Sequence, residues 1–257
     1  MIFVFVFGLI IGSFLNVCIY RIPLKKSIVN PPSGCPGCGE RIRFYDNIPI
    51  ISYIILKGKC RHCRRPISLL YPFVELITGL LSLAVFVNYY PDYGQYLALF
   101  LFVSSLVVIS FIDLSHQIIP DVISIPGIIA GLLMTVIFNI VSTYPISWYD
   151  SLAGIIAGGG ILYLVAVGYK KLTGKEGMGF GDVKLLAMIG AWMGWRALPF
   201  IILISSLTGS IIGATALLLA GKGLRTRIPF GPFLVLGAFI YLFFGTRIES
   251  FYFSLFM

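Results

Sequence analysis

Charged residues are scarce in this chain of 257 residues, where they make up 11% of the total against 58% hydrophobic residues. A soluble domain averages about 25% charged and about 45–50% apolar residues. The shortage of charge excludes a soluble globular enzyme, a disordered chain and a disulfide-rich secreted module. The apolar excess lies in long runs, which is typical of a polytopic helical membrane protein.

Eight apolar runs are candidate membrane spans, because a helix needs about 20 apolar residues to cross the hydrocarbon core. They lie near 2–20, 69–89, 96–113, 121–141, 151–169, 183–195, 198–220 and 231–246. The sixth run is short, and Gly190, Gly194 and Pro199 blur its border with the seventh, so six or seven spans with a re-entrant 183–220 region are the alternative. The sequence predicts an all-α polytopic membrane protein with about eight transmembrane helices.

Basic residues are missing from the chain's start, which has neither a basic n-region nor a small-residue cleavage site, so we expect a retained anchor and not a signal peptide.

Seventeen of the 19 Lys and Arg residues lie in three segments, 21–68, 170–184 and 221–230. Because Lys and Arg mark cytoplasmic loops, we expect the N-terminus outside the cell and these segments in the cytoplasm. Contact with anionic membrane lipid then accounts for the net charge of +9, and no nucleic-acid partner is needed.

Residues 23–68 form the one polar segment long enough to fold, and they contain two C-x-x-C knuckles. The cysteines are Cys35, Cys38, Cys60 and Cys63. Four thiolates presented by paired knuckles suit a closed, structural Zn²⁺ site, and a metal would stabilise a segment too short for a large core. Two disulfides are disfavoured in a reducing cytosol. A redox dithiol or a set of cysteines without a shared role would also fit the spacing.

Acidic residues number only ten, so those near a span are informative. Asp113 ends the third run, Asp121 opens the fourth and Asp182 opens the sixth, all at the expected cytoplasmic face. Carboxylates inside a membrane are costly and are functional candidates by default. Two of them in one site can work as acid and base on a water molecule, which is the chemistry of an aspartic protease.

Other roles for these carboxylates remain open. Asp182 and Asp121 could be helix N-caps, whereas a negative charge at Asp113, near a helix C-terminus, is unfavourable and harder to explain as a cap. A proton-coupled transporter could use the same carboxylates. Gly177, Gly179 and Gly181, around Asp182, permit close backbone approach, and Gly179 and Gly181 are the candidates for the approach of an extended peptide substrate.

Four further polar or reactive residues are expected to have structural roles. Glu75 could cap the second span or make a polar contact at the cytoplasmic face. We expect Asp46 at the surface or in a turn, His116 solvated in a 114–120 loop, and Cys18 as a small buried side chain in the first span.

A series of motifs covers nearly the whole chain. They are G-S-F-L-N-V-C-I-Y-R-I-P at 12–23, the two C-x-x-C knuckles with N-I-P-I-I-S-Y between them, Y-P-F-V-E at 71–75, D-L-S-H-Q-I-I-P-D at 113–121, G-x-G-D-V-K at 179–184 and I-P-F-G-P-F-L at 228–234. In this order they resemble the type IV prepilin peptidases, membrane aspartic proteases of the type IV pilus and type II secretion systems. Leu70 departs from the family, because many members carry a basic residue there.

The resemblance implies that Asp113 and Asp182 are the catalytic pair of an aspartic endopeptidase. It also implies that the enzyme cuts the basic leader of prepilins and pseudopilins after a glycine, on the cytoplasmic side of the inner membrane. Methylation of the new N-terminal amine with S-adenosylmethionine would follow. The implied division is a first transmembrane helix at 1–22, a cytoplasmic zinc domain at 23–68 and a transmembrane peptidase domain at 69–257.

Two other functions could use the same aspartates or cysteines. A proton-coupled transporter often has inverted repeats and a site at the bilayer midplane, but no matching halves are detectable here, and the carboxylates lie at one face. A zinc-knuckle docking protein without catalysis would tolerate the loss of either aspartate. No glycine fingerprint of a dinucleotide-binding fold is present, so the site of S-adenosylmethionine is not assigned from sequence.

Overall fold

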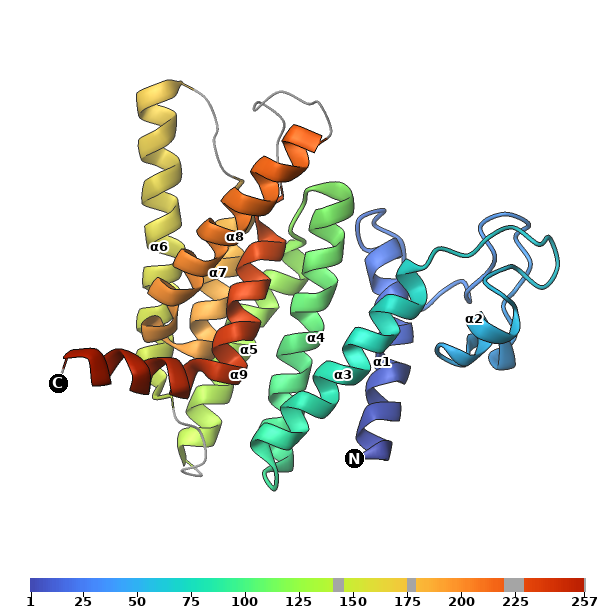
Figure 1. Ribbon diagram of the computed structural model, residues 1–257, viewed down its shortest axis with the longest axis horizontal. Coiled ribbons are helices and arrows are strands. Elements are labelled where there is room, and N and C mark those ends of the chain that lie inside the picture. The colour runs from blue at the N-terminus through green and yellow to red at the C-terminus, as the bar shows by residue number, and fades with distance from the viewer. Residues whose placement is uncertain (141–145, 175–178, 220–228, 257) are drawn as a thin grey trace. The chain divides into compact units, whose positions relative to one another are not determined.

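A computed structural model describes residues 1–140, 146–174, 179–219 and 229–256. Apart from two isolated β-bridges, regular structure in these ranges is helical. The elements are α1 (Ile2–Arg21), η1 (Phe44–Asn47), α2 (Ile51–Ile55), α3 (Leu70–Tyr89), α4 (Tyr93–His116), α5 (Asp121–Ile140), α6 (Trp148–Thr173), α7 (Phe180–Met193), η2 (Trp195–Ala197), α8 (Leu198–Leu219) and α9 (Gly231–Phe256) (Figure 1). Within the described residues, each predicted apolar run falls on one helix, so the all-α prediction is confirmed.

Five helices of the described ranges are long and apolar enough to cross a membrane. They are α1, α3, α4, α6 and the η2–α8 segment over Trp195–Gly213. The apolar parts of α5 and α9 are shorter, and α7 has 14 residues. Residues 183–219 belong to α7, η2 and α8, and α7 ends before Gly194, which has a φ of 75°. Eight spans therefore stay a prediction, while a multi-pass membrane protein is supported by the helices described.

The chain divides into two compact units, Met1–Val108 and Ile109–Met257, and the boundary falls inside α4. The predicted segments 1–22 and 23–68 lie wholly in the first unit. Of the residues on which the topology and the glycine prediction depend, Lys175, Gly177, Lys222, Arg225 and Arg227 lie outside the described residues.

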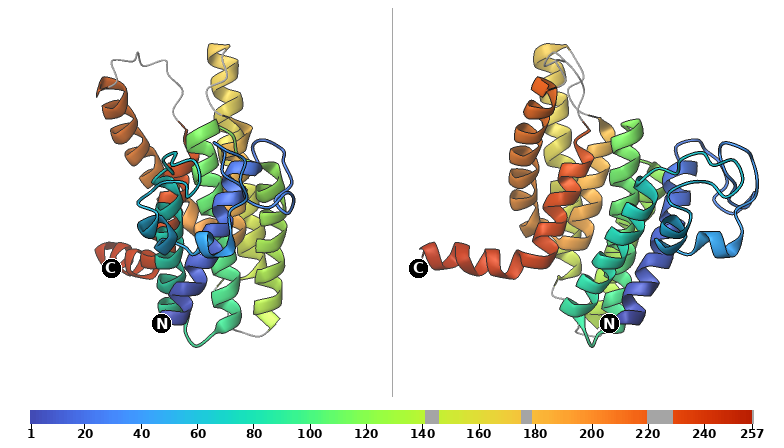
Figure 2. Two further views of the ribbon diagram at one scale, coloured as in Figure 1. Left: turned by 90° about the vertical axis from the view of Figure 1, so that its right-hand side faces the viewer. Right: turned by 45° about the vertical axis from the view of Figure 1, so that its right-hand side comes forward.

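In the first unit, α1 lies side by side with α3 (Figures 1 and 2). Close approach depends on glycines: a Cβ on Gly8 would lie 2.6 Å from the Ser82 Cβ, and one on Gly12 would lie 2.7 Å from the Glu75 Cα. Gly8 and Gly12 form a G-x-x-x-G pattern, which lets membrane helices pack backbone to backbone. The buried Ser82 hydroxyl also donates to the carbonyl of Val4 over 3.0 Å.

The segment that joins α1 to α3 is hydrogen-bonded to both helices. The buried Arg21 guanidinium, at the end of α1, donates to the carbonyls of Ser27 and Pro31 at 2.9 and 2.7 Å. On α3, Glu75 Oε2 accepts the N–H of Ile50 at 2.8 Å. Ile50 has a φ of 62°, a strained conformation for a β-branched residue, so this hydrogen bond holds a backbone that would otherwise relax.

In the second unit, α7 packs against α5 and α6. A Cβ on Gly131 of α5 would lie 2.7 Å from Trp192, and the backbones of Gly154 on α6 and Gly190 on α7 are in direct contact. All nine residues from Leu185 to Met193 are buried. Because α7 is enclosed by protein, its first turn has a fixed position, and Asp182 lies in that turn.

The start of α9 is fixed by α8, which packs beside it (Figure 1). The fully buried Ser205 hydroxyl of α8 donates to the carbonyl of Phe233 at 2.9 Å. A Cβ on Gly237 would lie 3.0 Å from the carbonyl oxygen of Ile201, so the two helices are close along their contact. This packing places the first residue of α9, Gly231, at the carboxylate of Asp113.

Candidate active site and metal centre

Asp113 lies in the last turn of α4 and is 5% exposed. Its Oδ2 accepts a hydrogen bond of 3.0 Å from the backbone N–H of Gly231, the first residue of α9. A negative charge at a helix C-terminus is unfavourable, whereas the free N–H groups at a helix N-terminus attract one. The N-terminus of α9 therefore stabilises a carboxylate that the C-terminus of α4 disfavours.

Asp182 is the third residue of α7 and is half-buried. Its carboxylate is hydrogen-bonded to the backbone of Gly179, the residue that precedes α7, and it interacts electrostatically with Asp113. The N-cap position itself belongs to Gly179, so Asp182 does not occupy it, although its side chain bonds back to the N-cap backbone as in a capping box. The structure thus brings together the two aspartates that the sequence paired.

Two carboxyl groups in one partly dry site can share a proton between them. One can then accept a proton from water while the other donates one to a leaving group. This is what the arrangement of Asp113 and Asp182 can do chemically, and it needs no group beyond the two side chains and water.

Asp121 differs from the other two aspartates. It is the first residue of α5 and not its N-cap, and Oδ1 pairs with Lys184 Nζ at 2.7 Å. The interpretation of Asp121 as a capping residue is therefore replaced by an ion pair that links the first residue of α5 to the fifth residue of α7. Lys184 is two residues beyond Asp182 on α7, and residues at this spacing do not face each other on a helix.

The two candidate glycines have different surroundings. A Cβ on Gly181 would lie 2.8 Å from the Ile119 Cβ, which gives this glycine a packing role in the approach of α7 to the segment before α5. A Cβ on Gly179 would meet nothing closer than 3.9 Å. A role for either residue in substrate approach stays a prediction.

The four predicted cysteine ligands lie together, with their sulfur atoms within 4.8 Å of one another. Cys35 Sγ and Cys63 Sγ, one from each knuckle, are 3.7 Å apart. Ligands at about 2.3 Å from a tetrahedral Zn²⁺ are separated by about 3.8 Å, so the spacing fits such an ion. The donor set and the geometry agree with a metal site.

The two knuckles have the same backbone design. The N–H of Cys35 donates to the Glu40 carbonyl and the N–H of Cys60 to the Arg65 carbonyl, each at 2.9 Å. The N–H groups of Gly37 and, to a smaller degree, Cys38 lower the pKa of the Cys35 thiol to about 6. A lower pKa favours the thiolate, which is the form that binds a metal.

The remaining candidates lie outside the aspartate pair and the cysteine cluster. Asp46, only 11% exposed at its side chain, pairs with Arg61 at 2.5 Å. Glu75 is 8% exposed and makes the polar contact with Ile50 described above. Cys18 is buried as expected, and His116 is exposed but forms the last residue of α4 instead of a loop.

Sequence reasoning missed two features of the site, the Gly231 N–H and the pair of Asp121 with Lys184. Gly231 lies in the I-P-F-G-P-F-L motif, to which the sequence alone gives no role. A glycine beside a proline just before an apolar run could have indicated a helix start aimed at an anion. The charges of Asp121 and Lys184 are visible in the sequence, but no local pattern links residues 63 positions apart.

Comparison with known proteins gives two family matches that follow one another along the chain. Residues 6–89 match the bacterial peptidase A24 N-terminal domain, and residues 100–214 match the type IV leader peptidase family. No solved structure is detectably similar to the chain.

Among curated relatives, the prepilin leader peptidase/N-methyltransferase of Aeromonas hydrophila is 41% identical, over 99% of this chain and 94% of its own length. Proteins with the same name from Pseudomonas aeruginosa and Burkholderia pseudomallei are 40% and 37% identical, over 95% of this chain and 90% and 85% of their own lengths. None of these names supports a transporter.

Proposed function

Because the chain belongs to the type IV leader peptidase family, we propose that it removes the leaders of prepilins and pseudopilins after a glycine and then N-methylates the new N-terminus. We assign the cleavage to Asp113 and Asp182. The observation that carries this assignment is their convergence: two carboxylates from α4 and α7 interact in one site, beside the N-terminus of α9.

Asp113 is the base in this mechanism. The Gly231 N–H and the positive end of α9 stabilise its negative charge. A water molecule between the carboxylates gives a proton to Asp113 while its oxygen attacks the carbonyl carbon of the scissile peptide. Protonated Asp182 then gives its proton to the leaving nitrogen as the C–N bond breaks. Transfer of the proton from Asp113 to Asp182 through water then restores the starting state.

The methyl donor proposed for the second activity is S-adenosylmethionine, which supplies an electrophilic methyl group when bound. The new amine forms the N–C bond, the electrons of the broken C–S bond stay on sulfur, and the resulting ammonium releases a proton to solvent. The chain would therefore provide a pocket for an adenosyl group attached to a cationic sulfonium.

The metal proposed for the cysteine cluster is Zn²⁺. Cys35, Cys38, Cys60 and Cys63 supply four protein ligands, which leaves no open position for catalysis. The ion would hold the two knuckles together, because few apolar contacts can do so in a segment where most residues are exposed. Its role is structural.

For the membrane, we propose an inner-membrane protein with its N-terminus outside and its active site at the cytoplasmic face. The basic segment 21–68 supports this orientation. We keep the three parts 1–22, 23–68 and 69–257 as a functional division, although the compact units meet inside α4. Substrates would be prepilin and pseudopilin precursors of type IV pili and type II secretion.

The test is cleavage of a synthetic prepilin-like precursor by detergent-purified protein. Asp113→Asn and Asp182→Asn should each abolish cutting after the leader glycine. Asp150→Asn is the matched control, because it removes one negative charge from the same unit while an oxygen remains to accept the bond from Trp195 Nε1. If either active-site variant cuts as fast as the control, that aspartate is structural and the assignment is wrong.

A further inference from the structure

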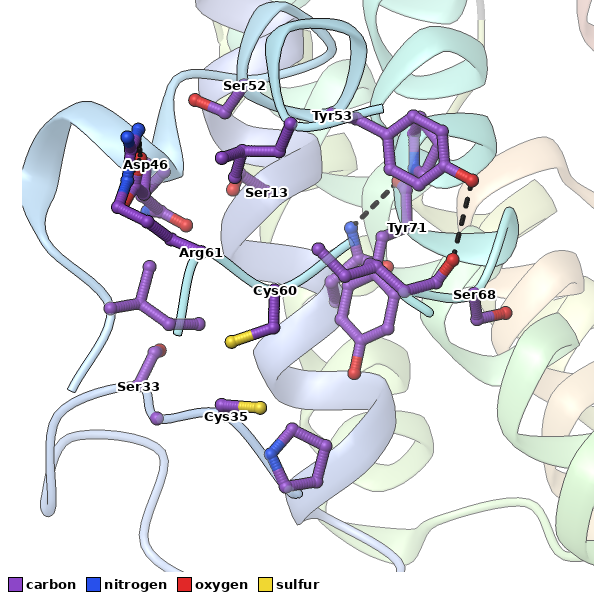
Figure 3. Close-up of a pocket in the computed structure, with 18 of the residues that line it drawn as sticks. Ser13, Ser33, Cys35, Asp46, Ser52, Tyr53, Cys60, Arg61, Ser68 and Tyr71 are labelled. Atoms are coloured by element: carbon purple, nitrogen blue, oxygen red, sulfur yellow. Dashed lines mark hydrogen bonds and ion pairs between the residues drawn. The ribbon is translucent and has the colours of Figure 1, made fainter. Parts of the chain in front are cut away.

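The first unit encloses a cavity of about 490 Å³ between α1, α3 and the segment that joins them. Small-molecule sites commonly measure about 300–1,000 Å³, so the volume suits a ligand of nucleoside size. Figure 3 shows the side chains around it, with Cys35 and Cys60 on one side and Tyr53 and Ser68 on the other. The two candidate catalytic aspartates belong to the other unit, and neither of them lines this cavity.

Glu75 is the residue of the cavity that indicates a cationic ligand. Its side chain lines the space, is more than nine-tenths buried, and makes no ion pair with any basic residue in the described ranges. The carboxylate accepts the Ile50 N–H and is hydrogen-bonded to the Ser13 side chain, which leaves further acceptor capacity on its two oxygens. A buried carboxylate is costly unless it has a charged partner, and a cation in the cavity would be that partner.

Aromatic rings supply the second half of a recognition site. Tyr20 of α1, Tyr53 of α2 and Tyr71 of α3 all line the cavity. The Tyr53 hydroxyl is 3.4 Å from the Ile67 carbonyl, and the Asn16 side-chain amide donates to the Tyr71 carbonyl at 3.1 Å, so both segments are held in place. Aromatic faces attract cations and stack on purine bases.

We propose that this cavity binds S-adenosylmethionine, with Glu75 facing the cationic end of the ligand and the tyrosines around the adenosyl group. The inference rests on the proposed methyltransferase activity and assigns it to a site. The sulfonium of this ligand would be recognised by a buried carboxylate and its adenine by aromatic side chains, and the cavity has both. The residues that line the cavity all lie within 6–89, the part of the chain whose family match is separate from the type IV leader peptidase match at 100–214.

The first experiment uses the wild-type chain, so no variant has to fold. The full protein in detergent is irradiated with S-adenosylmethionine tritiated in the methyl group, and labelled peptides are identified. We expect label on peptides that contain Tyr53 or Tyr71, and its suppression by excess S-adenosylhomocysteine. Label confined to residues 109–257 would overturn the proposal.

The second experiment measures the dissociation constant of S-adenosylmethionine by equilibrium dialysis. Glu75→Gln keeps an oxygen for the Ile50 N–H and removes the charge, and it should weaken binding by about tenfold or more, as expected for one hydrogen-bonded charge. Asp92→Asn is the control, because Asp92 caps α4 in the same unit and does not line the cavity. Equal affinity in Glu75→Gln and the control would refute the role of Glu75.

Failure of this inference can be told apart from failure of the proposed function. If the wild-type protein binds no S-adenosylmethionine and methylates no cleaved substrate, the methyltransferase activity itself is wrong. If it binds and methylates but the label lies elsewhere, only the assignment of the cavity is wrong.

Discussion

Asp113 accepts a hydrogen bond from the backbone N–H of Gly231 at 3.0 Å, across 118 residues of sequence. Asp113 lies in the last turn of α4, and Gly231 is the first residue of α9. Because the donor is a backbone group at a helix N-terminus, the helix must start at this residue for the bond to exist. The placement of α9 is thereby part of the candidate active site.

Gly231→Ala should slow cleavage strongly without unfolding the protein. The added Cβ would lie 2.7 Å from Asp113 Oδ2, so the carboxylate or the helix start must move. Loss of a hydrogen bond to a charged group is worth about 1.5–3 kcal/mol, or roughly 10–100-fold in rate if the bond is needed in the transition state. The measurement is kcat for cleavage of a prepilin-like precursor.

Gly160→Ala on α6 is the matched control for Gly231→Ala, because a Cβ there would meet nothing within 4 Å. It should cleave at the wild-type rate. Equal rates in the two variants would mean that the contact of Gly231 with Asp113 does not matter for catalysis.

Asp121→Asn should retain most cleavage activity, in contrast to the same change at Asp113 or Asp182. Its partner Lys184 and Asp121 itself are 35% and 56% exposed at the side chain, and such ion pairs contribute only about 0.2–1 kcal/mol. The pair joins the start of α5 to α7 and contains neither Asp113 nor Asp182. Rates of single variants and of the Asp121→Lys/Lys184→Asp exchange test this, since the exchange should recover what each single charge reversal loses.

Much of the fold could be predicted from the apolar runs, because each of them had the length of a helix. The cysteine cluster was also predictable, since its ligand spacing is local. The partner of Asp113 was not, because it depends on how α8 packs on α9. The enclosure of α7 was not predictable either, since an apolar side chain such as Leu186 suits lipid and protein contacts equally.

The first unit should lose stability in acid, because protonation of Asp46 breaks its ion pair with Arg61. The Arg61 guanidinium, hydrogen-bonded to the carboxylate at 2.9 Å, holds the pKa of Asp46 below its ordinary value. A depressed pKa in the folded state stabilises the fold above the unfolded value of about 3.9, and this stabilisation is lost as pH falls through the folded pKa.

The test compares the melting temperature of wild type and Asp46→Asn as a function of pH. The gap should be small at pH 7, because Arg61 is 45% exposed, and it should close in acid. A double-mutant cycle with Arg61→Gln isolates the pair. A gap that is constant with pH would show that the carboxylate contributes through something other than its charge.

Cys38→Ser should remove the metal, whereas Cys18→Ser should keep it. Cys38 is one of the four clustered thiols, while Cys18 is buried in α1 away from them. Elemental analysis by mass spectrometry should give about one zinc per chain for wild type and Cys18→Ser. The same metal content in both variants would contradict a four-cysteine site.

Metal removal should also affect the cavity of the first unit. Cys35 and Cys60 line it, one from each knuckle, so the ion would hold two of its walls together. We expect the chelated protein to bind S-adenosylmethionine more weakly and to be cut by trypsin within residues 23–68. Unchanged binding after complete removal of zinc would separate the metal from the cavity.

Gly154→Ala should weaken the packing of α6 on α7 and, through it, the position of Asp182. The nearest atoms to a Cβ at Gly154 belong to the backbone of Gly190, which cannot rotate away as a side chain could. Overpacking of this kind costs about 1–3 kcal/mol. Because Asp182 lies in the first turn of α7, a shift of that helix moves the carboxylate relative to Asp113, and cleavage should fall together with the melting temperature.

Gly159→Ala, five residues along the same helix, separates this effect from a general intolerance of α6. Its Cβ would lie 3.5 Å from the Ala187 Cβ, an ordinary contact, and replacing a helical glycine by alanine stabilises by about 0.5–1 kcal/mol. It should therefore melt at or above the wild-type temperature and cleave normally. If Gly154→Ala also cleaved normally despite a lower melting temperature, the position of α7 would tolerate displacement, and Asp182 would not depend on the contact between Gly154 and Gly190.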